Sequence, residues 1–304
     1  DILKTVLGVY VKSYGNSSSL QTISINGLGA EHTVILLNGS KLNSIQNGQT
    51  DLSLIPAGDI QKIEVMNNGF SSMYGSDAMG GVVNIITDDV SSKKLNVKAG
   101  GEIGSYNFKK YLFKISNSFK KLKYHFSLTS EKSDNDYKFY FDDGTNIELR
   151  NKSKSAFEIS NYSLNSEYLL GKNSALSYYA QFVNSYREVP GVETGNTPPN
   201  TVQLDKNWNN ILKYSFQKKN ITFTSDFNYQ NNLMNYNTYP VLLSYYKNIL
   251  LASLNKVEIN SKNNSFNFGN EIQYAALYSN ELNDNINRKH YAIFASSKIV
   301  INNL

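Results

Sequence analysis

The chain has 304 residues and a formal net charge of +5, and only 18% of its residues are charged, compared with roughly 25% in an average globular protein. It contains no Cys, which excludes disulfide scaffolds, zinc ribbons and clusters bound by thiolates. No stretch approaches the ~18 consecutive apolar residues of a transmembrane helix, so helical membrane proteins are excluded as well. An average hydropathy does not exclude a membrane β-barrel, because its strands are apolar only at every second residue.

The first part of the chain, up to about residue 90, contains short apolar runs separated by Gly, Asn and Asp. The runs at 33–37, 60–66 and 82–87 are rich in Val and Ile, which predicts strands of a small sheet. Short helical turns are expected at 1–7, 56–59 and 71–74. We therefore predict a small α+β domain over residues 1–90.

From about residue 93 onward, aromatic and aliphatic residues alternate with Lys, Ser, Asn, Gln and Thr. Leu122, Tyr124, Phe126 and Leu128, for example, share one face of an expected strand. This period of two predicts strands with one apolar and one polar face. We expect about ten such strands, at roughly 93–103, 106–117, 121–131, 153–169, 174–187, 204–217, 220–230, 245–259, 264–278 and 288–301.

The connections between these strands alternate in length. Short polar turns are expected at 117–121, 171–174, 217–220 and 260–264, and long connections at 133–152, 188–203, 231–244 and 279–287. Outer-membrane barrels are built in this way, with tight periplasmic turns and long external loops. Soluble sandwiches and lectins also consist of alternating strands, so the pattern alone leaves both architectures open.

The first 90 residues also carry five motifs in a fixed order. They are ISINGLG at 23–29, VILLNG at 34–39, DLSLIP at 51–56, IQKIEV at 60–65 and YGSDAMGGVVNIIT at 74–87. Through these motifs the chain closely resembles the plug domain of TonB-dependent outer-membrane receptors. The second half is similar, in pattern only, to the barrels of vitamin B12 and siderophore receptors.

The resemblance implies a mainly β fold, in which a small α+β plug fills the lumen of a 22-stranded antiparallel transmembrane barrel. It implies the outer membrane of a Gram-negative type of cell, with lipid around the barrel. The implied function is energy-coupled uptake of a small, scarce chelate such as a ferric siderophore, haem or cobalamin. The implied partner is a periplasmic TonB-type protein that pulls on a short N-terminal box.

That box is not visible in the sequence, and about ten strands are too few to enclose a plug. We therefore expect a fragment, with a plug over 1–90 that lacks its N-terminus and the N-terminal portion of a barrel over 91–304. Family members usually carry Arg-Gly-Pro just after the strand at 60–65, whereas this chain has Asn67-Asn68-Gly69. An ionic latch between plug and barrel at this position is therefore in doubt.

Two plug loops point toward the ligand in the receptors that the chain resembles, and they correspond here to 43–49 and 71–77. The loop at 43–49 is rich in amides and holds no charge, which favours a chelate recognised by its shape and polar edges. An alternative interpretation of equal weight is that these residues only form a turn, since Asn-Gly is a turn signal. In the barrel, Tyr186 offers an aromatic ring for stacking, and Arg187 offers a rigid fork of hydrogen-bond donors. The expected ligand-binding residues are Asn43, Ser44, Asn47, Gln49, Ser76, Asp77, Tyr186 and Arg187.

Other functions receive little support from the sequence. No catalytic motif is present, so we expect no enzyme, and the scattered Lys residues argue against nucleic-acid binding. A binding-only β-domain, adhesin-like or lectin-like and without transport, is the alternative function. We expect no cofactor; an external loop offers oxygen ligands for Ca²⁺, but it lacks EF-hand spacing, and a solvated acidic loop is the preferred interpretation. The candidate ligands are Asp134, Asp136, Asp142 and Asp143.

Overall fold

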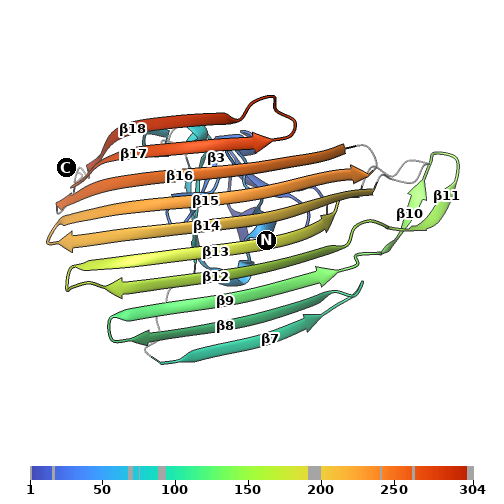
Figure 1. Cartoon of the computed structure of the whole chain (residues 1–304), viewed down its shortest axis with the longest axis horizontal. Coiled ribbons are helices and arrows are strands. Elements are labelled where there is room, and N and C mark those ends of the chain that lie inside the picture. The colour runs from blue at the N-terminus through green and yellow to red at the C-terminus, as the bar shows by residue number, and fades with distance from the viewer. Residues whose placement is uncertain are drawn as a thin grey trace.

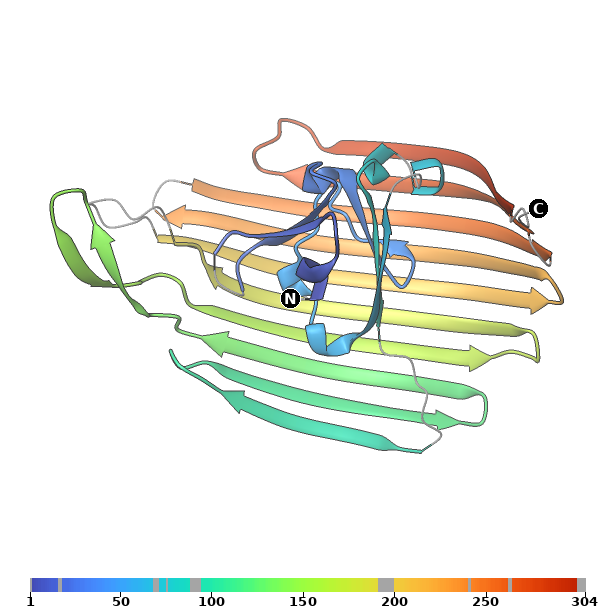
Figure 2. The ribbon, with the colours of Figure 1, turned by 180° about the vertical axis from the view of Figure 1, so that it is seen from behind.

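The computed structural model describes residues 2–15, 18–67, 71–74, 76–87, 94–190, 200–239, 242–261 and 264–299. The described residues form a large antiparallel sheet, here called the barrel sheet, and a small α+β unit, here called the plug, that spans residues 2–87. The plug lies against one face of the barrel sheet (Figures 1 and 2). This arrangement confirms the predicted fold class of a small α+β plug followed by part of an antiparallel barrel.

The barrel sheet has ten strands in the order β18-β17-β16-β15-β14-β13-β12-β9-β8-β7. All ten strands predicted from the alternation are present. Their bounds are β7 (Asn96–Ile103), β8 (Lys109–Phe119), β9 (Leu122–Ser133), β12 (Phe157–Leu169), β13 (Ser174–Glu188), β14 (Asn200–Lys218), β15 (Ile221–Tyr239), β16 (Leu242–Ser261), β17 (Asn264–Ser279) and β18 (Ile286–Ile299).

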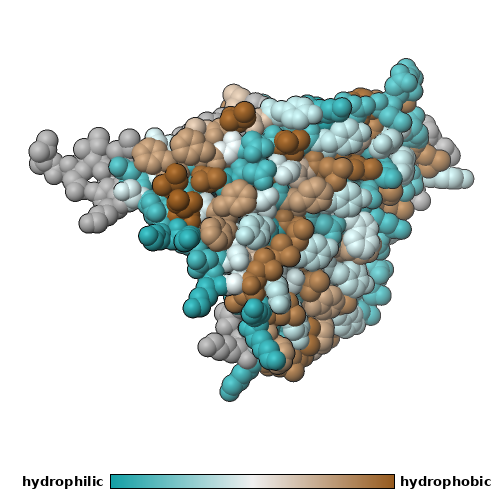
Figure 3. Space-filling model, turned by 60° about the vertical axis from the view of Figure 1, so that its left-hand side comes forward, coloured by the Kyte–Doolittle hydropathy of each residue, from teal (hydrophilic) through white to brown (hydrophobic). Residues whose placement is uncertain are grey.

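The two faces of the barrel sheet differ in chemistry, as the alternation predicts. The face turned toward the plug carries mostly polar side chains, and many of them are buried. The opposite face carries aromatic and aliphatic side chains, and a broad patch of them is visible in the oblique view of Figure 3. On this outer face the ring of Phe182 lies 4.2 Å from that of Trp208 and 6.1 Å from that of Tyr162.

The connections follow the predicted alternation of short and long at several positions and depart from it at others. The turns after β8, β12 and β14 are short and lie at one end of the barrel sheet. The long connection expected at 231–244 is wrong, because β15 continues to Tyr239 and β16 begins at Leu242. The strand carries Asn on both faces here, because Asn232 lies opposite Asn207 on the inner face whereas Asn231 lies opposite Trp208 on the outer face, so the alternation of polarity is lost although the strand continues. The connection at 134–156 contains a hairpin of its own, β10 (Lys138–Asp142) paired with β11 (Ile147–Asn151).

The plug contains a four-stranded sheet in the order β4-β3-β6-β5 and a separate hairpin, β1-β2. The predicted strands at 33–37, 60–66 and 82–87 are confirmed as β3 (Thr33–Leu37), β5 (Ile60–Asn67) and β6 (Gly81–Thr87). The sequence analysis missed β1 (Val9–Ser13), β2 (Gln21–Ile25) and β4 (Ser40–Lys41). The helical turns are η1 (Ile2–Thr5), η2 (Ala30–His32), η3 (Leu52–Leu54), η4 (Ala57–Asp59), α1 (Ser71–Tyr74) and η5 (Ser76–Ala78). None of the helices in the described ranges has the length and apolar character needed to cross a membrane.

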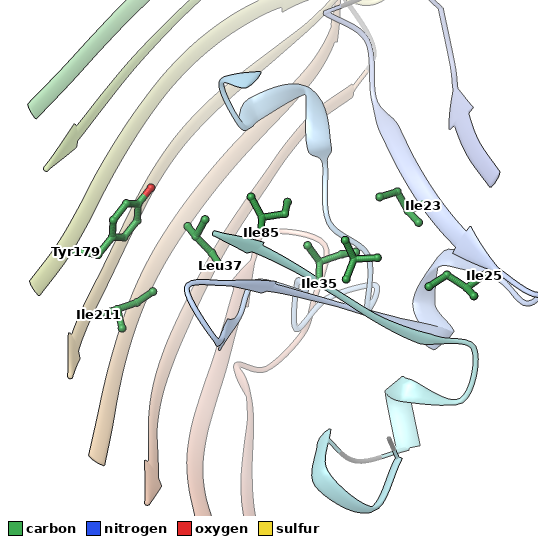
Figure 4. Close-up of a cluster of buried hydrophobic side chains, with 8 residues drawn as sticks. Ile23, Ile25, Ile35, Leu37, Ile85, Tyr179 and Ile211 are labelled. Atoms are coloured by element: carbon green, nitrogen blue, oxygen red, sulfur yellow. The ribbon is translucent and has the colours of Figure 1, made fainter. Parts of the chain in front are cut away.

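The apolar core of the plug continues into the barrel sheet. Leu37 and Ile85, on neighbouring plug strands, belong to one buried cluster with Tyr179 of β13 and Ile211 of β14. Figure 4 shows these two barrel side chains directed toward the plug sheet. The cluster therefore fixes where the plug lies along β13 and β14. The predicted domain boundary near residue 90 falls in the segment 88–93, outside the described residues, and stays a prediction.

Candidate ligand-binding site

A cavity of about 250 Å³ lies between the plug and the inner face of β13–β16. Its barrel side is formed by the N-terminal half of β14, which begins at Asn200, and by the strands beside it. The cavity therefore lies toward the end of the barrel sheet that the sequence analysis expects to be external. Its polar lining includes Ser44, Gln46, Asn47, Gln49, Thr50 and Asp51 of the plug, and Gln181, Gln203, Asp205, Asn207, Asn209, Asn232 and Asn248 of the barrel sheet.

The loop at 43–49 brings three of its four expected ligand residues to this cavity. Ser44, Asn47 and Gln49 line it. Ser44 Oγ accepts a hydrogen bond from the backbone amide of Gln46 at 3.2 Å, and Asn47 Oδ1 accepts one from the backbone amide of Gln49 at 3.1 Å. Gln49 Nε2 donates to Glu31 Oε2 at 3.4 Å. The side-chain nitrogen of Asn47, Nδ2, has no hydrogen-bond partner among the described residues, so it is available to a ligand.

Asn43, the fourth residue of this set, has a structural role. Its side chain is 4% exposed. Its Nδ2 donates to the carbonyl oxygens of Thr33 at 2.9 Å and Gly48 at 2.7 Å, and its Oδ1 accepts from the amide of Ile35 at 2.8 Å. Asn43 thus ties the loop to β3, and its hydrogen-bonding groups are used within the plug. At this position the structure supports the turn interpretation of the sequence.

Arg187 was expected to offer its guanidinium to a ligand, but the structure uses the group to join the plug to the barrel sheet. The side chain is 5% exposed. Its Nη1 donates to Asp51 Oδ2 at 2.7 Å, Ser53 Oγ at 3.1 Å and the carbonyl oxygen of Ser18 at 3.2 Å. Its Nη2 donates to Asp205 Oδ2 at 2.6 Å. This group, with the cation on the barrel and a carboxylate on the plug, is here called the Arg187 latch.

Two further expected residues lie away from the cavity. Tyr186 is on the outer face of β13, opposite Glu158 and Leu204 in the strand register. Asp77 forms an ion pair with the ammonium group of Lys41 inside the plug. Neither Tyr186 nor Asp77 lines the cavity, and the side chain of Ser76 lies outside the described residues. The loop at 71–77 and the loop at 43–49 therefore do not converge on one cavity in the described part of the chain.

The acidic residues proposed for Ca²⁺ are used in turns. Asp134 Oδ2 accepts from Asn107 Nδ2 at 3.0 Å, and Asp142 Oδ1 accepts from the amide of Gly144 at 2.8 Å. Asp143 Oδ1 accepts from the Thr145 hydroxyl and from the amides of Asn146 and Thr145, and these bonds lower the pKa of its carboxyl to about 2. Within the described residues, which include Asp136, no three His, Asp or Glu side chains form a group that could hold a metal ion.

A second plug–barrel contact was missed by the sequence analysis. Asp59 of the plug is buried, and its Oδ1 lies 3.0 Å from Lys114 Nζ and accepts from Ser127 Oγ at 2.7 Å. Its Oδ2 accepts from Ser163 Oγ at 2.9 Å. The available signal was a Lys on the polar face of a predicted strand, where an inward cation needs a partner from the plug.

Comparison with known proteins identifies the family of the plug. A family model described as the TonB-dependent receptor plug domain matches residues 1–82. A vitamin B12 transporter from Vibrio vulnificus (strain YJ016) is 45% identical over 87 residues, which are 29% of this chain and 14% of the transporter. The identity is thus concentrated in a segment about as long as the plug.

Two solved structures share the fold of nearly the whole chain. A ferric enterobactin receptor from Pseudomonas aeruginosa matches with a TM-score of 0.73 and 15% identity, over 98% of this chain and 52% of that receptor. The ferric citrate transporter matches with a TM-score of 0.72 and 16% identity, over 98% of this chain and 51% of that transporter. The chain therefore spans about half the length of these structures. Its relatives are transporters and receptors and not enzymes.

Proposed function

We propose that this chain, which has the plug domain and the fold of a TonB-dependent receptor, is part of an outer-membrane protein that takes up a scarce chelate. Ferric siderophores, haem and cobalamin are the candidate ligands. One observation carries the proposal: the plug lies on the polar face of a strongly two-faced sheet, and a hydrogen-bonding cavity lies between the two. A protein that only binds at its surface has no use for a plug in this position.

The outer face of the barrel sheet supports a membrane location. Tyr162, Phe182 and Trp208 lie side by side on neighbouring strands, none of the described elements covers them, and the Trp208 side chain is 48% exposed. An apolar outer face and a polar interior are typical of outer-membrane barrels. The proposed environment of this face is lipid, in the outer membrane of a Gram-negative type of cell.

The contacts of the plug support energy-coupled transport. The plug is joined to the barrel sheet by the Arg187 latch, by the Asp59–Lys114 contact, and by single hydrogen bonds such as Asn161 Nδ2 to the Leu54 carbonyl oxygen at 3.1 Å. These contacts are separate from the hydrogen bonds between the strands of the plug itself. The plug can therefore be moved or reshaped against the barrel sheet. The proposed partner for that work is a periplasmic TonB-type protein.

Uptake measurements in cells test the proposal. The full-length receptor gene would be deleted, and accumulation of radiolabelled cobalamin, haem and ferric siderophores would be compared with and without the energy-coupling protein. We expect uptake of one chelate to require both proteins. Binding of a chelate or a glycan at the surface with no energy-dependent uptake would instead favour the adhesin-like or lectin-like alternative.

A further inference from the structure

We propose that the cavity selects an electrically neutral chelate whose rim carries amide or hydroxyl groups, and that it disfavours anionic chelates such as ferric catecholates and ferric citrate. The inference rests on the proposed function of the cavity as the ligand site, and it adds the chemical class of the ligand. Two features of the site carry it: the charges of the lining and the amides of the barrel side.

The lining holds two carboxylates and no cation. Among the described residues that line the cavity, the only charged side chains are Asp51 and Asp205. Both are paired with Arg187, whose two terminal nitrogens are directed at them at 2.7 Å and 2.6 Å. Two carboxylates and one guanidinium leave a net negative charge, and the guanidinium is already committed. An anionic chelate would lose its hydration here without gaining a counter-charge.

Side-chain amides make up most of the polar lining on the barrel side of the cavity. Asn207, Asn232 and Asn248 lie directly opposite one another on β14, β15 and β16, so they form one row across three strands. The Oδ1 atoms of Asn232, Asn248 and Asn209 are buried without a hydrogen-bond partner in the described structure. An amide both donates and accepts, so this row suits a neutral ligand with polar groups on its edge.

Binding measurements on the purified full-length receptor in detergent test the inference. The probes are two neutral chelates, cyanocobalamin and a ferric trihydroxamate, and two anionic ones, ferric enterobactin and ferric citrate. We expect one neutral probe to bind at least a hundredfold more tightly than either anionic probe. Replacing Asn232 and Asn248 together by Ala should weaken its binding at least tenfold. The matched control is Asn184→Ala, an exposed Asn on the outer face of β13, which should leave binding unchanged.

A gain-of-function variant tests the role of charge separately. Asn207→Lys places a cation in the lining and should strengthen binding of an anionic probe at least tenfold. Tight binding of ferric enterobactin or ferric citrate by the unaltered receptor, lost in the Asn232/Asn248 variant, would overturn the inference and leave the proposed function intact. If no chelate is taken up by cells that carry the receptor, the proposed function itself fails.

Discussion

Arg187 shows how a single side chain can connect two parts of this molecule that are distant in sequence. The Arg that the family usually carries after the strand at 60–65 is replaced here by Asn67-Asn68-Gly69. An ionic connection exists nevertheless, but with the cation on the barrel sheet and the carboxylate of Asp51 on the plug. The resemblance implies a cation on the plug, so the two charges of this connection are on the opposite parts of the molecule.

Removing the Arg187 cation should loosen the plug. Arg187→Ala leaves Asp51 and Asp205 buried without their partner, and breaking a buried pair in this way costs about 3–5 kcal/mol. Arg187→Lys should have an intermediate effect, because it keeps the charge but not the donor fork. The measurement is the urea concentration at which a protease begins to cleave the plug of the full-length receptor. Lys206→Ala, on the outer face of β14, is the control, and equal midpoints for all variants would contradict the role of the latch.

Asn43 and Asn47 should respond differently to the same substitution. Asn43→Ala removes three hydrogen bonds of a buried side chain, and each backbone group left unsatisfied costs about 1–3 kcal/mol. We expect the plug to lose stability and the receptor to become less abundant in the membrane. Asn47→Ala should lower ligand affinity at unchanged abundance, since Asn47 is exposed at the cavity. Immunoblots of membranes together with binding isotherms would separate the two effects, and identical outcomes would show that both residues only form the turn.

Among the strands, β17 depends on a glycine at one point of its packing. A Cβ atom at Gly269 would lie 2.3 Å from Phe294 Cζ and 2.5 Å from the backbone oxygen of Asn255. Gly269→Ala therefore requires both a side chain and a strand backbone to move, and such overpacking typically costs about 1–3 kcal/mol. A lower melting temperature of the full-length receptor in detergent is the expected result. Gly100→Ala in β7 is the matched control, because a Cβ atom there meets nothing within 4 Å.

The hairpin β10-β11 has an acid-resistant tip. The hydroxyl of Thr145 and two backbone amides lower the pKa of Asp143 from 3.8 to about 2. Because the pKa of the folded state is depressed, these hydrogen bonds contribute fully to stability at pH values above the pKa of the unfolded state. The contribution is lost as the pH falls through about 2. A carbon-13 NMR titration of the Asp143 carboxyl, assigned with Asp143→Asn, measures this value. A midpoint near 4 would show that the turn hydrogen bonds do not persist in solution.

The period-two alternation was sufficient to locate every strand of the barrel sheet but not their ends. Strand ends depend on where pairing stops, and at 231–244 polar residues on both faces of the continuing strand were mistaken for a loop. The plug hairpin β1-β2 was missed for a related reason, because β1 has little burial on either face and leaves a weak pattern. The parallel pairing of β3 with β6 joins segments almost fifty residues apart, which local patterns do not reveal.

The lining of the cavity was predicted in part. Ser44, Asn47 and Gln49 line it and belong to a loop that follows a recognisable motif, and their binding of a ligand stays a prediction. The role of Arg187 could not be predicted, because its partner Asp51 is 136 positions away in sequence and no local pattern links the two. Tyr186 was assigned to the site although its neighbour Arg187 faces inward, and successive residues of a strand face opposite sides. If Arg187 faces inward, this rule places Tyr186 on the outer face of the strand.

Considered as a whole, the barrel sheet is open. Among the described strands, β7 pairs only with β8 and β18 only with β17. Backbone groups left unpaired in lipid cost several kcal/mol each, so two open edges oppose insertion as a monomer. We expect residues 1–304, expressed alone, to form no heat-modifiable, protease-resistant monomer in bilayers. Appearance of such a species on gels would show that the two edges close on each other.

The polar character of the plug–barrel contact has a thermodynamic consequence. Apart from the cluster at Tyr179 and Ile211 and the contacts around Leu54, the inner face meets the plug through amides, hydroxyls and ion pairs. Exposing apolar surface raises the heat capacity by about 0.45 cal/mol/K per Å², whereas exposing polar surface lowers it by about 0.26. The polar part of the contact therefore offsets part of the heat-capacity increase when the plug leaves the sheet. The enthalpy of releasing the plug should therefore change less with temperature than that of separating a hydrophobic domain interface.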